Sequence, residues 1–102
     1  MKTLPSAIVD VEFLDPSVGG RDNTLVTSPY RPHFRVGDGE LLGVQFFGGP
    51  DTPVPPSVVV SAKAQFMYFP EVNYDALCPG AQFEVREGAR IVGVGLVKKL
   101  LP

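Results

Sequence analysis

The sequence predicts an all-β protein in which six short antiparallel strands close into a β-barrel of the Greek-key type. Apolar residues recur with a period of two along most of the chain, and no stretch shows a convincing period of 3.6. The 11 glycines and 11 prolines fall at intervals, as expected for turns between short strands. A chain of 102 residues, 44% hydrophobic and 20% charged, fits one domain that spans residues 1–102.

Three strands are predicted in the N-terminal half of the chain. Over residues 7–13 every second residue from Ala7 onward is apolar, so one face of this strand should be buried. A polar loop then leads to a second strand over 33–36, in which Phe34 points inward. The Asp-Gly pair that follows tolerates positive φ and favours a tight hairpin into a third strand over 40–47.

The C-terminal half supplies the other three strands. Residues 48–56 include four prolines, which lack the donor that a sheet ladder needs, so this segment is predicted to be a loop. The longest β-type run follows over 58–69 and predicts the fourth strand. After a second long connection, alternation over 81–86 predicts the fifth strand, and a two-residue turn at Glu87-Gly88 leads to the sixth, over 90–97.

Two glycines indicate how tightly this sheet curves. Gly93 and Gly95 are two residues apart and therefore share a face of the sixth strand, where side chains would crowd a strongly bent sheet. Six short strands with such bends favour a closed barrel over an open sheet.

Charge and cysteine content narrow the class of function. Nine Lys and Arg against eleven Asp and Glu give a net charge of −2, so no overall basic field would attract nucleic acid. The single cysteine, Cys78, has no partner for a disulfide or a CxxC motif, which favours a reducing cytoplasm. Asp10 and Glu12 interrupt the N-terminal apolar stretch before a signal-peptide core could form. We therefore expect a cytoplasmic protein without a membrane segment.

No catalytic, metal or cofactor site is predicted. His33 is the only histidine and occupies an outward strand position, so it is expected to be a surface residue rather than a general base or ligand. Asp10, Glu12 and Asp15 fit no calcium loop. The Gly-Val-Gly sequence at 93–95 lacks the third glycine and the helix of a dinucleotide site, and no phosphate-binding loop is present.

Three motifs follow one another along the chain: Gly19-Gly20-Arg21, Tyr30-Arg31-Pro32-His33-Phe34, and the segment from Phe83 to Gly95 with Arg-Glu-Gly-Ala-Arg at its centre. In order and approximate spacing they resemble the third domain of bacterial elongation factor Tu. That family typically reads Gly-Gly-Arg, Tyr-Arg-Pro-Gln-Phe and Arg-Glu-Gly-Gly-Arg-Thr-Val-Gly-Ala-Gly. The resemblance implies a six-stranded antiparallel barrel that is not catalytic, packs against a GTPase domain and touches the T-stem of aminoacyl-tRNA.

The resemblance also indicates interface positions. Gly19 and Glu87 match residues at the family's interdomain surface, whereas His33 and Glu84 stand where the family has glutamine and alanine. A carboxylate placed in a packed interface costs desolvation energy unless it finds a partner. Docking on a GTPase domain of the Tu type is therefore less expected than docking on another protein.

On the tRNA side, Arg21 and Gly88 match family positions, but Asp22 beside Arg21 would repel phosphate. The scaffold is thus expected to be kept and its binding surface altered. Alternative interpretations are that Tyr30 caps the barrel core and that the charges around 86–90 form a solvated turn. The candidate interface residues are Gly19, Arg21, Tyr30, Arg31, His33, Glu84, Glu87, Gly88 and Arg90.

Three functions follow from these observations. The first is a free-standing, non-catalytic module that binds a protein partner, such as a translation GTPase or another translation component. The second is an accessory protein of translation with weak, local tRNA binding. The third is a domain that supplies to a separate GTPase chain what the fused domain normally supplies. The acidic charge balance favours the first over the second.

Overall fold

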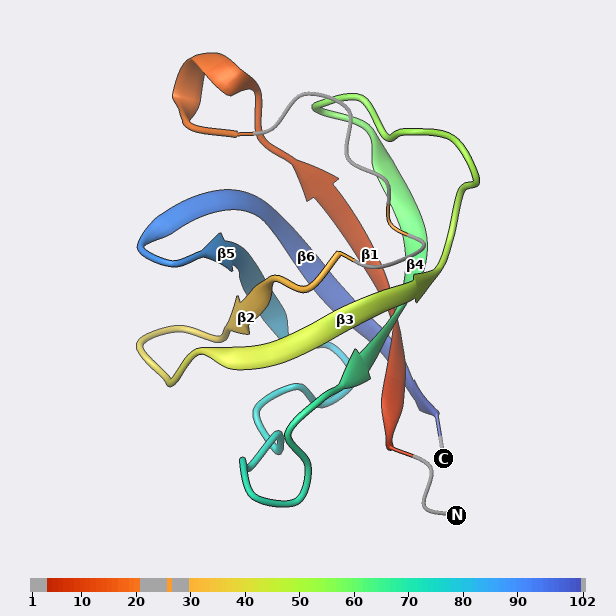
Figure 1. Cartoon of the computed structure of the whole chain (residues 1–102), viewed down its shortest axis with the longest axis vertical. Coiled ribbons are helices and arrows are strands. Elements are labelled where there is room, and N and C mark those ends of the chain that lie inside the picture. Colours follow the sequence, from red (N-terminus) through yellow and green to blue (C-terminus); the bar gives the residue numbers. More distant parts are fainter. Residues whose placement is uncertain (1–3, 21–25, 27–29, 102) are drawn as a thin grey trace.

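Six strands close into a barrel in the order β1-β4-β3-β2-β5-β6, and all neighbours are antiparallel (Figure 1). This structure is a computed structural model and describes residues 4–20, 26 and 30–101. Strands β2, β3 and β4 are consecutive neighbours, and β1 lies beside β4, which is an arrangement of the Greek-key type. The strands are β1 Ser6–Phe13, β2 His33–Arg35, β3 Leu42–Gly48, β4 Val59–Phe66, β5 Gln82–Glu87 and β6 Arg90–Leu101.

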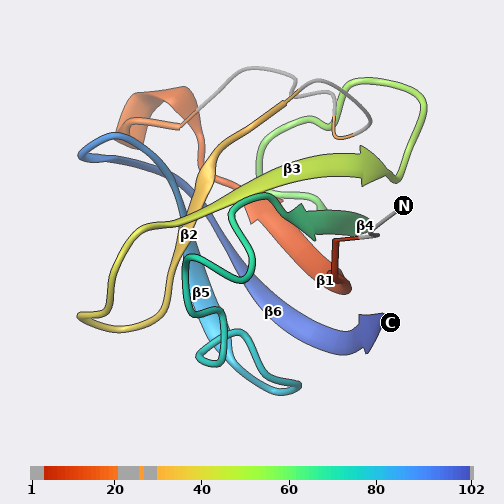
Figure 2. The ribbon, with the colours of Figure 1, turned by 60° about the horizontal axis from the view of Figure 1, so that its bottom comes forward.

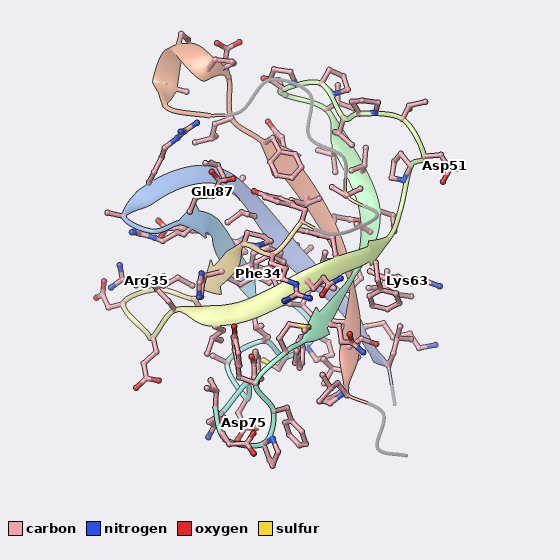
Figure 3. The ribbon with its side chains drawn as sticks, viewed as in Figure 1. Phe34, Arg35, Asp51, Lys63, Asp75 and Glu87 are labelled. Atoms are coloured by element: carbon pink, nitrogen blue, oxygen red, sulfur yellow. The ribbon has the colours of Figure 1, made fainter. Side chains whose placement is uncertain are left out.

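The interior of the barrel is filled by the apolar residues of the alternating pattern. In β1 every second residue from Ala7 to Phe13 is buried, and the residues between them face outward. Phe34 from β2 lies in the middle of the barrel (Figure 3), and its ring stacks on that of Phe83 with the centroids 4.0 Å apart. Other buried strand residues are Leu42, Val44, Phe46, Ala62, Ala64, Phe66, Val85, Val92 and Val97.

The connection between β4 and β5 closes one end of the barrel, as Figure 2 shows. Tyr74 and Leu77 from this connection are buried in the core. The Tyr74 ring stacks on Phe66 with the centroids 4.7 Å apart, and its hydroxyl donates to the carbonyl oxygen of Gly43 at 2.7 Å. Burial raises the pKa of the Tyr74 phenol.

The crowding expected at the two glycines of β6 is confirmed. A Cβ atom on Gly95 would lie 2.6 Å from the carbonyl oxygen of Asp10 and closer still to the Phe83 ring. A Cβ atom on Gly93 would lie 2.9 Å from the carbonyl oxygen of Glu12. Glycine at these positions lets β6 cross β1 without a clash.

Three of the expected strands are shorter in the structure than predicted from the sequence. The second was expected over 33–36 but ends at Arg35. The third was expected to begin at residue 40 but begins at Leu42, since the Gly39 amide closes the preceding turn on the Val36 carbonyl. The fourth was expected over 58–69 but ends at Phe66. The Tyr68 amide donates to the Tyr74 hydroxyl at 3.0 Å instead of to a carbonyl of a neighbouring strand, and the Tyr68 ring is exposed.

The last hairpin also differs from the prediction. Its two turn residues are Gly88 and Ala89 rather than Glu87 and Gly88, because Glu87 still pairs with Arg90 at the end of the β5–β6 ladder. The sixth strand continues beyond residue 97 to Leu101, where it pairs with the start of β1. The register of the β1–β6 ladder shifts between Ile8 and Val9, where β6 has one extra residue, Lys98.

Candidate functional site

One rim of the barrel brings together Gly19, Tyr30, Glu87, Gly88 and Arg90, and we call this group the rim. The Arg90 guanidinium donates from Nε to the Gly19 carbonyl oxygen at 2.6 Å and from Nη2 to that of Gly20 at 2.8 Å. The Tyr30 hydroxyl donates to Oε2 of Glu87 at 2.8 Å. Figure 1 shows the loop after β1 beside the β5–β6 turn. Side-chain bonds therefore join the rim's separate segments.

The loop after β1 has a defined backbone. It contains a 3₁₀ turn, η1, over Pro16–Val18, and the side chain of Asp15 caps that turn by accepting a hydrogen bond from the Ser17 amide at 2.9 Å. This hydrogen bond lowers the pKa of the Asp15 carboxyl. Gly19 follows with φ 93°, a left-handed conformation that favours glycine. At Gly20, a Cβ atom would clash with the Leu14 carbonyl.

Tyr30 has a structural role at the rim. Its ring is stacked on Phe46 at a centroid distance of 5.7 Å and lies 6.2 Å from the Phe13 ring. It therefore packs against the core, as one of the two interpretations of the sequence proposed. Its hydroxyl extends from the core to Glu87, which Figure 3 shows at the β5–β6 hairpin.

His33 and Glu84 lie on the outer wall of the barrel rather than at the rim. His33 is opposite Arg86 in the β2–β5 ladder, and Arg35 is opposite Glu84. The Arg86 guanidinium contacts Oε1 of Glu84 through Nε and Nη2, each at 2.9 Å. The Glu84 carboxylate, which was expected to cost desolvation energy in a packed interface, thus has a partner within the chain.

Arg86 is a wall residue that the sequence analysis did not include among its candidates. Besides pairing with Glu84, it donates from Nη1 to the carbonyl oxygen of Ala89 at 3.4 Å. The available signal was the spacing: residues two apart in a strand share a face, so Glu84 and Arg86 are neighbours of opposite charge. Of the remaining candidates, Arg31 is exposed just before Pro32, and Arg21 lies outside the described residues.

The rim exposes an aliphatic side chain. Val18, the last residue of η1, is 66% exposed, and it directly precedes the Gly19 carbonyl that Arg90 holds. The turn residues Gly88 and Ala89 and the Arg90 side chain are also exposed. The rim thus offers an aliphatic group, a turn backbone and a fixed guanidinium to solvent.

A second surface, which we call the groove, lies on the outer face of β1, β5 and β6, beside β4 and the β2–β3 turn. Its volume is about 630 Å³. The groove could not be predicted from the sequence, because it depends on which strands are neighbours in the barrel. The groove is lined by Asp10, Val11, Glu12, Arg35, Gly37, Val59, Gln82, Phe83, Glu84, Val94, Gly95 and Leu96.

No known family model matches the chain. Among the described residues, no three side chains of the His, Cys, Asp and Glu types gather as they would around a metal ion. Within that same part of the chain, no helix is long and apolar enough to cross a membrane. Cys78 is exposed and is a free cysteine.

Proposed function

We propose that this protein is a non-catalytic binding module of the cytoplasm, similar to the third domain of elongation factor Tu, that binds a protein component of translation through the rim. The observation that carries the proposal is the pair of hydrogen bonds from Arg90 to the carbonyls of Gly19 and Gly20. These bonds join residues about seventy positions apart and fix two connections against each other. Without these hydrogen bonds, the loop after β1 and the β5–β6 turn could move independently.

Fixing the rim before binding favours protein recognition. Binding to a surface that is already ordered avoids the conformational entropy cost of ordering its loops during association. The second contact, from Tyr30 to Glu87, ties the β5–β6 hairpin to the aromatic core. The exposed Val18 side chain then gives a partner apolar area to bury.

Charge at the rim supports a protein partner over tRNA. The guanidinium of Arg90 already donates to two carbonyl oxygens, and the Glu87 carboxylate is nearby in the same hairpin. Phosphate binding depends on several cations that release counterions, and a chain of net charge −2 offers few of them.

The proposal is tested by capture from an extract that contains ribosomes and tRNA, with proteins identified by mass spectrometry and RNA by sequencing. The captured protein is then purified, and its affinity is measured for the wild type and for Val18→Glu. Because the substitution places a charge at the centre of the proposed contact, we expect affinity to fall by about tenfold or more. Leu100→Glu makes the same kind of change at a residue that is 44% exposed on β6, and should leave affinity unchanged.

Two results would overturn the proposal. Equal affinities for Val18→Glu and the wild type, with both proteins folded, would place the binding surface away from the rim. Saturable tRNA binding with a sub-micromolar dissociation constant at physiological salt would replace the protein partner with RNA.

A further inference from the structure

We infer that the groove is a second docking site, separate from the rim, for an extended peptide segment that alternates basic and aliphatic side chains. The inference depends on the residues that the closed barrel places side by side on its outer face. It does not depend on the function proposed for the rim.

Aliphatic side chains lie in the groove at positions that alternation would normally give to polar residues. Val59 of β4 and Val94 of β6 are each paired with Glu12 of β1, one on either side. They are 60% and 43% exposed, respectively. Leu96 adds a third aliphatic side chain to the lining. Exposed apolar area grouped in a concave surface is typical of a binding site.

The charges of the groove are predominantly negative. Asp10, Glu12 and Glu84 line it, against the single guanidinium of Arg35. Arg35 is itself engaged, since its Nε donates to the carbonyl oxygen of Gly39 at 2.9 Å. Glu84 is paired with Arg86 on the wall. The two carboxylates of β1 are therefore the ones available to a ligand.

These two carboxylates are only weakly compensated within the chain. Asp10 has one ion-pair partner, Lys98, at 3.8 Å, and the Lys98 side chain is 53% exposed, so this pair contributes little stability. The backbone of Glu12 pairs with β4 and β6, but its carboxylate has no hydrogen-bond or ion-pair partner among the residues that the structure describes. A cationic side chain laid over β1 would gain a charge-assisted hydrogen bond here.

The spacing between the Asp10 and Glu12 carboxylates matches the repeat of an extended peptide. Residues two apart in a strand are separated by about 6.6 to 6.8 Å, and an extended ligand has the same repeat. If the peptide backbone lies along the boundary between β1 and β6, its side chains point alternately toward the two strands. Two basic residues then face Asp10 and Glu12 on β1, and the aliphatic residue between them faces Val94 on β6. Nucleic acid is disfavoured at this surface because its phosphates would meet carboxylates.

The test uses a fluorescein-labelled decapeptide with alternating arginine and valine at its centre, titrated against the full chain by fluorescence anisotropy at physiological salt. A second peptide has glutamate in place of each arginine. We expect the arginine peptide to bind at least about tenfold more tightly. We also expect Glu12→Gln to weaken its binding about fivefold to tenfold, through loss of a charge-assisted contact.

Matched variants separate a specific site from diffuse attraction. Glu71→Gln removes the same charge from an exposed loop and should leave binding unchanged. Val94→Ser keeps all charges but reduces aliphatic contact, and should weaken binding about fivefold. Melting temperatures of all variants confirm that each is folded.

The inference is wrong if the two peptides bind equally, or if Glu71→Gln weakens binding as much as Glu12→Gln does. It is also wrong if Val94→Ser binds as the wild type does. Val18→Glu at the rim should leave peptide binding intact. Loss of peptide binding in that variant would contradict two separate surfaces, whereas failure of the peptide experiment alone leaves the proposed function of the rim standing.

Discussion

Replacing Gly95 with alanine should destabilise the barrel severely. The added methyl group would lie 2.6 Å from the carbonyl oxygen of Asp10 and closer still to the Phe83 ring. Phe83 cannot move aside, since it is 3% exposed and stacked on Phe34 with the centroids 4.0 Å apart. Overpacking of a filled core by one methyl group costs about 1 to 3 kcal/mol, and a backbone clash puts this site near the upper end.

The expected loss of about 3 kcal/mol corresponds to a drop in melting temperature of about 12 to 24 °C for a domain of this size. Urea unfolding followed by circular dichroism, together with calorimetry, measures both quantities. The control is Gly43→Ala, whose methyl group would also meet an aromatic ring, that of Tyr68. Because Tyr68 is 56% exposed and free to turn toward solvent, we expect a change of less than about 1 kcal/mol.

The reasoning would be refuted if Gly95→Ala unfolded within about 0.5 kcal/mol of the wild type, or if the two variants lost equal stability. In either case the close approach of β6 to β1 would not depend on glycine.

Three further predictions concern the rim and the titrating groups. Arg90→Ala should cost about 1 kcal/mol, because the lost bonds are exposed, and should accelerate amide exchange in η1; unchanged exchange would mean that the guanidinium does not hold that loop. Tyr74→Phe should cost about 1 to 2 kcal/mol at neutral pH, since the Gly43 carbonyl and the Tyr68 amide lose a partner. The raised pKa of Tyr74 also means that its contribution to stability is complete below about pH 10 and is lost as the pH rises through the folded-state value, so the variant should show a shallower decline in urea titrations above pH 10. For Asp15 the lowered pKa predicts stability that is present above its usual value of 3.8 and lost as the pH falls further, and carbon-detected NMR should place its midpoint below 3.8; a midpoint above that value would contradict the cap to Ser17.

The barrel could be predicted from the sequence because buried apolar residues alternate with outward-facing residues along its strands. Once every second residue from Ala7 to Phe13 must be buried, β1 has one possible inward face, and the same holds for β5. The glycine pair of β6 added that the sheet is strongly curved. The ends of strands could not be predicted in this way, since the end of β4 depends on the Tyr74 hydroxyl, which comes from a separate connection.

The candidate site was only partly predictable, for a similar reason. The motif around Glu87 and Arg90 drew attention to the β5–β6 turn, but the partner of Arg90 is a carbonyl in the loop after β1, and no local pattern encodes that contact. Predicting the groove would have required the order of the strands in the barrel. Val59 and Val94 become neighbours of Glu12 only because β1 lies between β4 and β6.

Chemical-shift mapping of the protein with its purified partner tests the proposed function most directly. A ¹⁵N-labelled sample is titrated with the protein identified by capture and, separately, with bulk tRNA at physiological salt. The account predicts that the amides of Val18, Gly19 and residues 88–90 shift with the partner, and that tRNA produces no saturable shifts. Shifts confined to the opposite end of the barrel, at the β4–β5 connection, or saturable shifts of the rim with tRNA, would contradict it.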